Sequence, residues 1–255
     1  MTESALSLSD QTPMADCRPC PHRDRLDQAR CQPGDRCVRV QSGRQIDRFF
    51  RYNPDLAPFY RHDPFWEMRA ITARYLPQHL LFELLDDPDE TVRRAVAARV
   101  PLEGLLQLLN DEDREVRITV ADRLPPEQLE KMATDSDYMV RNYVARRLPK
   151  GRLFRMIYDK DRLVRQTVAE RLPEVTLGLM ADDPEPEVRR IVAERIDPES
   201  AVMMLNDEDW VVRFYAARRV PLSALPPLLR DEEPDVVAVA QARLEANEDV
   251  VIKKN

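Results

Sequence analysis

The chain has 255 residues, of which 43% are hydrophobic and 33% are charged, and its formal net charge is −7. This composition is typical of a folded globular protein and argues against a surface that binds polyanions over most of its area. The five glycines form no phosphate-binding loop, which excludes the common glycine-rich nucleotide-binding motifs.

The N-terminal residues indicate the compartment. Residues 1–16 lack the basic start and the apolar run of a signal peptide, and no stretch of 18 apolar residues follows. We therefore expect a cytoplasmic protein that does not enter a membrane. In a reducing compartment, cysteines rarely persist as disulfides.

The first predicted element is a cysteine cluster in residues 1–40. Its spacing is Cys17-x2-Cys20-x10-Cys31-x5-Cys37, and the rest of the chain has no cysteine. Four thiolates can hold a tetrahedral zinc ion or a four-iron cluster, so Cys17, Cys20, Cys31 and Cys37 are the candidate metal ligands. The alternative is four unrelated thiols, or a redox pair formed by Cys17 and Cys20.

The spacing does not identify the metal, because it matches neither a paired C-x2-C zinc module nor the bacterial ferredoxin run. The arginine excess between Cys17 and Arg44 would offset the negative charge of either metal group. His22 lies two residues after Cys20, but with four thiols available we expect it to have a surface role.

Residues 41–67 hold seven of the chain's sixteen aromatic residues. We predict that residues 41–62 form an aromatic cap, which covers the first repeat and fixes the cysteine segment to it. The alternative is an exposed docking patch. The seven residues are Phe49, Phe50, Tyr52, Phe59, Tyr60, Phe65 and Trp66.

Residues 63–245 contain eight copies of the pattern V-R-x-x-V-A-x-R-L-P, which recurs every 24 residues without insertion or deletion. Such strict spacing indicates stacked, equivalent units, and the eighth copy departs from the pattern as a terminal repeat does. Residues 246–255 are a C-terminal tail. The first residue of the pattern falls at Met68, Val92, Val116, Val140, Val164, Val188, Val212 and Val236, and each repeat is counted from the aspartate five residues earlier, from Asp63 on.

Each repeat predicts one α-helix and one short second segment. An aspartate such as Asp87 supplies the N-cap, and the proline of the pattern ends the helix. Apolar residues and one alanine make a buried stripe, as in Val140, Val144 and Ala145. The segment after the proline fits a short α-helix or a 3₁₀ helix. No alternating pattern predicts a strand.

The arginine at the second pattern position lies beside the apolar stripe. An acid stands four residues before it in six copies, as in Asp89 and Arg93, which predicts helix pairs that staple successive repeats. The alternative is an arginine stripe that recognises an acidic partner or a phosphate backbone. These arginines are Arg69, Arg93, Arg117, Arg141, Arg165, Arg189 and Arg213.

No catalytic constellation is evident. The three histidines, His22, His62 and His79, are scattered before residue 80, and the carboxylates occupy repeating cap positions. We therefore expect a protein that is not an enzyme and has no small-molecule substrate.

The repeated pattern closely resembles that of the leucine-rich repeat variant family, and the four-cysteine cluster looks like that family's iron–sulfur segment. The resemblance implies an all-α solenoid of alternating α and 3₁₀ helices in a right-handed superhelix. It also implies a [4Fe-4S] cluster held by the four cysteines, and a link to nitrogen-fixation gene regions. Two departures from the pattern are Asp197 in place of the proline and Tyr75 in place of the late arginine.

The family gives no settled activity. Our leading hypothesis is an iron–sulfur repeat scaffold that binds a protein partner, connected with nitrogen fixation or redox sensing. One alternative is an electron-transfer component that uses the cluster. Another is a nucleic-acid binder that uses the arginine stripe and holds zinc in place of the cluster.

Overall fold

The structure is a computed structural model that describes residues 12–252, with side chains up to residue 246. The described residues form α-helices that alternate with 3₁₀ helices (labelled η), and they contain no strand, only one antiparallel bridge between Gln32 and Arg36. The expected all-α repeat solenoid is confirmed. None of the described helices has both the length and the apolar character that crossing a membrane requires.

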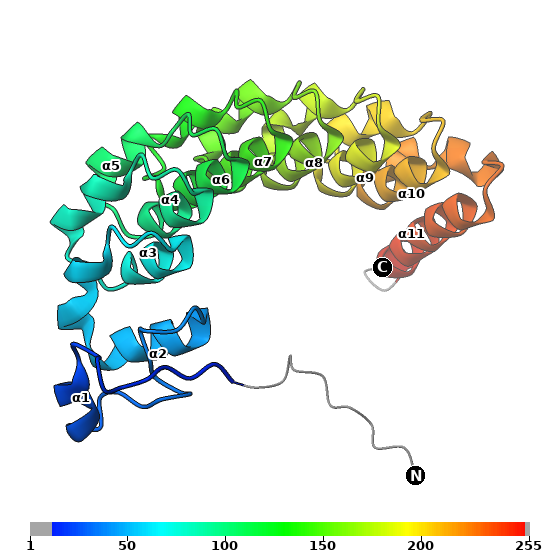
Figure 1. The fold of residues 1–255 in the computed structure, drawn as a ribbon. Helices are drawn as coiled ribbons and strands as arrows, with labels where there is room; N and C mark the ends of the chain where they lie inside the picture. The colour runs from blue at the N-terminus through cyan, green and yellow to red at the C-terminus, as the bar shows by residue number, and fades with distance from the viewer. Residues whose placement is uncertain (1–11, 253–255) are drawn as a thin grey trace, which may run out of the picture. The chain divides into compact units, whose positions relative to one another are not determined.

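The chain divides into two compact units, and the first ends at Leu124. It contains the cysteine segment and the first repeats, with α2, α3, α4 and α6 packed in succession (Figure 1). Its elements are α1 (Arg23–Asp27), α2 (Gly43–Tyr52), η2 (Pro54–Tyr60), α3 (Trp66–Thr72), η3 (Gln78–Leu84), α4 (Glu90–Ala97), α5 (Leu102–Gln107) and α6 (Arg114–Arg123).

The second unit begins at Pro125. Its helices α7 to α10 lie in one row, and each packs against the next (Figure 1). Its elements are η4 (Leu129–Met132), α7 (Tyr138–Arg147), η5 (Lys150–Met156), α8 (Arg162–Arg171), η6 (Glu174–Met180), α9 (Pro186–Arg195), η7 (Ser200–Met204), α10 (Trp210–Arg219), η8 (Leu222–Ala224), η9 (Pro226–Arg230) and α11 (Pro234–Ile252).

The predicted apolar stripe is the core of each repeat. In α8, Val164, Val168, Ala169 and Leu172 are all buried. Burying each valine or leucine contributes about 1.5–3 kcal/mol. The alanine leaves room for the neighbouring helix to approach, and its counterparts from Ala73 to Ala217 are also fully buried.

The helices begin two residues later than predicted. In α8 the N-cap is Asp161, whose carboxylate accepts a hydrogen bond from the Leu163 N–H. Asp159, the residue predicted to be the cap, instead accepts from the Asp161 N–H at 2.9 Å and so forms the turn before the helix. The prediction was wrong because the carboxylate of Asp159 is also engaged by an arginine of the preceding repeat.

The predicted helix ends are confirmed. The residue before each proline leaves the helical region, as in Leu172, which ends α8 with φ −54° and ψ 144°. Asp197, which stands in place of the proline, changes the geometry of the helix end little, because Ile196 before it still has φ −59° and ψ 152°. The Asp197 carboxylate accepts from the Ser200 N–H, so it organises the turn that proline makes elsewhere.

The short second segments are 3₁₀ helices in almost every described repeat, and α5 is an exception. In α5, Gly104 lies so close to the end of the preceding helix that a Cβ atom there would stand 2.2 Å from Val100 Cγ2. In the seventh repeat the Pro226-Pro227 pair begins the 3₁₀ helix η9, where it removes no internal helical hydrogen bond.

The second-position arginines staple successive repeats, but not through the predicted acid. Arg93 donates from Nε and Nη2 to both carboxylate oxygens of Asp111 in the next repeat, at 2.8 and 3.0 Å. Asp89, the predicted partner, is instead the N-cap of α4. The same pairing joins Arg69 to Asp87, Arg141 to Asp159, Arg165 to Asp183, Arg189 to Asp207, and Arg213 to Asp231.

These paired arginines do not form a surface stripe. Arg93, Arg141, Arg165, Arg189 and Arg213 are each at most 8% exposed. Their guanidinium groups are already bound to carboxylates, so they are not available to a phosphate backbone or an acidic partner.

The late arginine of the pattern also joins repeats. It stands at the end of its own helix, as in Arg123, which donates to the carbonyl oxygens of Ala97 at the end of α4 and of Val100 just after it, at 2.6 and 2.8 Å. Tyr75 replaces this arginine in the first repeat, and its hydroxyl reaches back to Asp47 of α2.

Candidate metal centre

The platform beneath the cysteine segment is α2 with η2. Phe49 and Phe50 are fully buried and meet edge to face, with 5.4 Å between the ring centroids. Both lie in α2, which packs against α3. Tyr52 and Phe59, which were also predicted for the cap, are 49% and 79% exposed.

The platform repeats the order of the solenoid, an α-helix followed by a 3₁₀ helix. The platform is also in register with the repeats, because Gln45 of α2 stands one repeat length, 24 residues, before Arg69. Gln45 is fully buried, and five of the seven arginines at the equivalent position are also buried. The sequence pattern did not reveal this unit, because Arg51, at the position of the late arginine, is the one defining residue of the repeat that it shares.

The first two cysteines lie on a short turn. The Cys20 N–H donates to the Cys17 carbonyl at 3.3 Å, and the Cys17 thiol points to the Ala15 carbonyl at 3.8 Å. Both cysteines are partly exposed. They therefore lie on the solvent side of the segment.

Cys31 and Cys37 are buried and flank a tight loop. Gln32 and Arg36 pair across it, and Gly34 turns the chain with φ +76°, a region that favours glycine. The Cys31 thiol donates to the Arg36 carbonyl at 3.2 Å. The Arg39 N–H donates to Cys37 Sγ at 3.4 Å, a contact that would stabilise a thiolate there.

Two buried amide side chains of the platform hold the cysteine segment. The Gln45 side chain donates from Nε2 to the main-chain carbonyl of Pro13, four residues before Cys17, at 2.9 Å. The main-chain carbonyl of Gln45 accepts from the Cys37 N–H. Asn53 donates to the carbonyl of Arg30, the residue before Cys31, at 2.9 Å. Pattern reasoning missed both, because a single buried amide leaves no periodic signal.

Histidine 22 is a third anchor and not the surface residue that we expected. Its ring packs against Phe49 and Tyr60, with centroids 5.7 and 5.8 Å apart. Burial lowers the pKa of His22, and it raises the pKa of Tyr60 to about 12. His22 Nε2 and the Tyr60 hydroxyl form a hydrogen bond 2.5 Å long.

The thiol pKa values show that the four cysteines share one environment. Burial first, and then the charges of Cys37, Cys20 and Cys17, together raise the pKa of Cys31 to about 11. Burial also raises the pKa of Cys37, while the Arg39 N–H opposes that shift. The segment thus places four thiols within electrostatic reach of one another.

The donor set fits a group that is ligated by four thiolates. The fit rests on the shared environment of the thiols and on the N–H that already donates to Cys37. Among the described residues, no three histidine, cysteine or acidic side chains form a ready single-ion site.

Comparison with known proteins agrees with both parts of the chain. Residues 11–58, which include all four cysteines, match the family model described as "LRV protein FeS4 cluster", and residues 114–137 match "Leucine rich repeat variant". The chain is 36% identical over 78 residues to an "Uncharacterized 27.7 kDa protein in nifB 3'region" of Rhodobacter capsulatus. That match covers 31% of this chain and 32% of the relative.

A solved structure is similar over much more of the chain. It is described as a leucine-rich repeat variant with a novel repetitive protein structural motif. It is 57% identical, with a TM-score of 0.85, and the match covers 91% of this chain and all of that one. The chain belongs to the leucine-rich repeat variant family, and its N-terminal part is the segment that the family's FeS4 cluster model describes.

Proposed function

We propose that this chain is an iron–sulfur repeat scaffold that binds a protein partner and catalyses no reaction itself. Cys17, Cys20, Cys31 and Cys37 would hold a [4Fe-4S] cluster. When bound, such a cluster supplies a one-electron redox couple, whose potential depends on hydrogen bonds to sulfur and on solvent exposure. The match to the FeS4 model supports this choice over zinc.

The observation that carries the partner-binding proposal is the apolar surface of the second unit. Its 3₁₀ helices and loops expose Tyr158 and Val175 at 84%, Met203 at 61%, Leu179 at 55% and Phe154 at 52%. In the repeats of the first unit, no described large apolar side chain exceeds 42%. Of the exposed residues of the second unit, Tyr158 and Leu179 line one hollow, and exposed apolar patches mark protein interaction sites.

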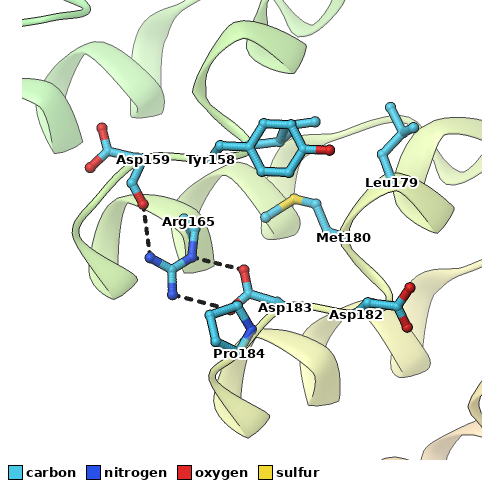
Figure 2. Close-up of a pocket in the computed structure, with 9 residues that line it drawn as sticks. Tyr158, Asp159, Arg165, Leu179, Met180, Asp182, Asp183 and Pro184 are labelled. Atoms are coloured by element: carbon cyan, nitrogen blue, oxygen red, sulfur yellow. Dashed lines mark hydrogen bonds and ion pairs between the residues drawn. The ribbon is translucent and has the colours of Figure 1, made fainter.

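One cavity on this surface has room for a partner's side chain. Tyr158, Leu179 and Met180 line a hollow of about 300 Å³ between two repeats (Figure 2). The Arg165–Asp183 pair also lines it and is already satisfied, and the exposed Asp182 adds a carboxylate beside the apolar side chains.

A second candidate function is electron transfer to a partner enzyme. The partial exposure of Cys17 and Cys20 favours it, because a redox group near solvent exchanges electrons more readily. The Rhodobacter relative, which is described by its position beside nifB, supports a role connected with nitrogen fixation. Higher amounts of the chain in cells that fix nitrogen than in ammonium-grown cells are the expected result.

The cluster is tested on protein purified without oxygen. We expect about four irons and four sulfides per chain and an EPR signal after dithionite reduction. Serine variants of Cys31 and Cys37 should lose both metal and signal. One zinc and no sulfide would overturn the iron–sulfur part of the proposal and leave the scaffold part standing.

Partner binding is tested by cross-linking capture with a double variant, Tyr158→Ser with Leu179→Ser. The matched control is Phe82→Ser with Leu102→Ser, which alters two less exposed apolar residues of the first unit. The same captured protein should be lost with the first pair and retained with the second. Equal capture by both would contradict this surface as the binding site.

A further inference from the structure

The cysteine segment is basic although the chain is acidic. Residues 12–52 contain nine arginines and five aspartates, with no lysine or glutamate. Residues 53–255 contain thirty basic and thirty-nine acidic residues. The segment that carries the candidate metal ligands therefore has a charge opposite to that of the repeats.

Most of this charge is already paired. Arg18 pairs with Asp16, Arg25 with Asp24 and Asp55, Arg48 with Asp35, and Arg51 with Asp47. Arg39 and Arg44 are both exposed, and neither side chain makes an ion pair or a hydrogen bond within the described residues. They therefore contribute free positive charge.

Arg39 and Arg44 both lie in residues 38–44, which we call the basic loop. No acid occurs between Arg36 and Ile46, so no residue of the loop itself neutralises it, and the carboxylate of Glu67 in α3 lies against the loop beside Gly43. The loop also leads into the N-terminus of α2, whose unpaired N–H groups add to the positive potential.

The basic loop borders a cleft next to a candidate ligand. The loop begins directly after Cys37, and Arg39 donates its N–H to Cys37 Sγ. Val38, Val40, Phe65 and Met68 line the cleft, which has a volume of about 460 Å³. Asp63 also lines it, and its carboxylate accepts a hydrogen bond from the Phe65 N–H. A molecule bound there would combine apolar contact with ion pairs beside the metal ligand.

We propose that the basic loop docks an acidic protein surface, with carboxylates on Arg39 and Arg44 and an apolar side chain in the cleft. This rests on the proposed function, and it names the site and charge of a partner that meets the cysteine segment. A protein fits better than nucleic acid, because two free arginines beside an apolar cleft offer few phosphate contacts. The acidic repeats would also repel a long polyanion.

The experiment measures binding of a purified plant-type ferredoxin, used as a small acidic probe protein. It compares the anaerobically purified chain with the double variant Arg39→Gln and Arg44→Gln. The matched control is Arg94→Gln with Arg230→Gln, which removes the same charge from two exposed arginines of the repeats that make no ion pair in the described structure. A single-stranded oligonucleotide is titrated in parallel, and iron and sulfide are assayed in every sample.

We expect the basic-loop variant to raise the Kd about tenfold at low salt, and the control to change it less than twofold. Added salt should weaken wild-type binding. Absence of binding, equal effects of both variants, or tighter binding of the oligonucleotide would overturn the docking proposal. If the samples contain zinc in place of iron and sulfide but still bind through the basic loop, the iron–sulfur part of the proposed function is refuted and the docking proposal stands.

Discussion

Arg165 and Asp183 join two repeats through a buried, two-pronged ion pair. Nε and Nη2 of Arg165 donate to the two carboxylate oxygens of Asp183, at 2.8 and 3.1 Å. Nη1 donates to the carbonyl of Asp159, which begins the same repeat as Arg165 (Figure 2). One planar guanidinium therefore fixes the turn of its own repeat and the carboxylate of the next, which a lysine could not do.

Replacing Arg165 with leucine should lower the free energy of unfolding by about 3–5 kcal/mol, because Asp183 would keep a buried charge without a partner. Arg165→Lys should cost less, since the charge remains and the fork is lost. Urea unfolding monitored by circular dichroism measures both. Arg162→Gln alters a more exposed pair with Glu187 and is the control. A loss below 1 kcal/mol for Arg165→Leu would contradict the role of the pair.

Low pH should weaken the ion pair between Arg213 and Asp231, the last of the arginine–aspartate pairs that join successive repeats. Arg213 holds the pKa of Asp231 below its usual value of 3.8. A lowered pKa in the folded state stabilises the fold above the usual value, and this stability is lost as the pH falls from about 4 through the folded value.

The Asp231→Asn variant should therefore lose less stability than the wild type between pH 5 and pH 3. Thermal unfolding across that range measures the difference, and Asp182→Asn, at an exposed aspartate, serves as the control. Parallel pH profiles for the wild type and Asp231→Asn would show that the pair has no such linkage.

The buried side-chain amides of Gln45 in α2 and of Asn53, which caps the end of α2, should control the metal content of the chain. Asn53→Leu removes the hydrogen bonds to the carbonyls of Arg30 and Phe49, and Gln45→Leu removes the bond to Pro13. We expect metal affinity to fall about 10- to 100-fold. Iron, sulfide and zinc per chain are measured with helix content, and exposed Gln78→Leu is the control. Full metal content in both variants would exclude this positioning role.

The alanine beside the neighbouring helix should not tolerate a larger side chain. Ala169 is fully buried, and its carbonyl accepts a hydrogen bond from Arg195. Ala169→Leu should destabilise the second unit by about 1–3 kcal/mol through overpacking. Chemical unfolding checks this against Glu170→Leu at the exposed neighbouring position, and a stable Ala169→Leu variant would indicate a looser helix contact than the structure shows.

The 24-residue period predicted much of the fold. The buried stripe of Val164 and Val168, the helix end before Pro173 and the stapling role of Arg165 all follow from local pattern. The candidate ligands follow from composition alone, since all four cysteines lie in one short segment. Such features repeat or cluster along the chain, so they can be read without knowing which repeats touch.

The tertiary structure decided which partner each repeated side chain takes. Asp89 is close enough in sequence to pair with Arg93, but Asp111 of the next repeat takes the guanidinium because stacking brings the two together. Gln45 and Asn53 hold the cysteine segment through contacts 32 and 23 residues apart in the chain. Sequence by itself determined the repeating unit and the four candidate ligands. Stacking decided the ion pairs and the anchors, because these depend on distances between residues that are far apart in the chain.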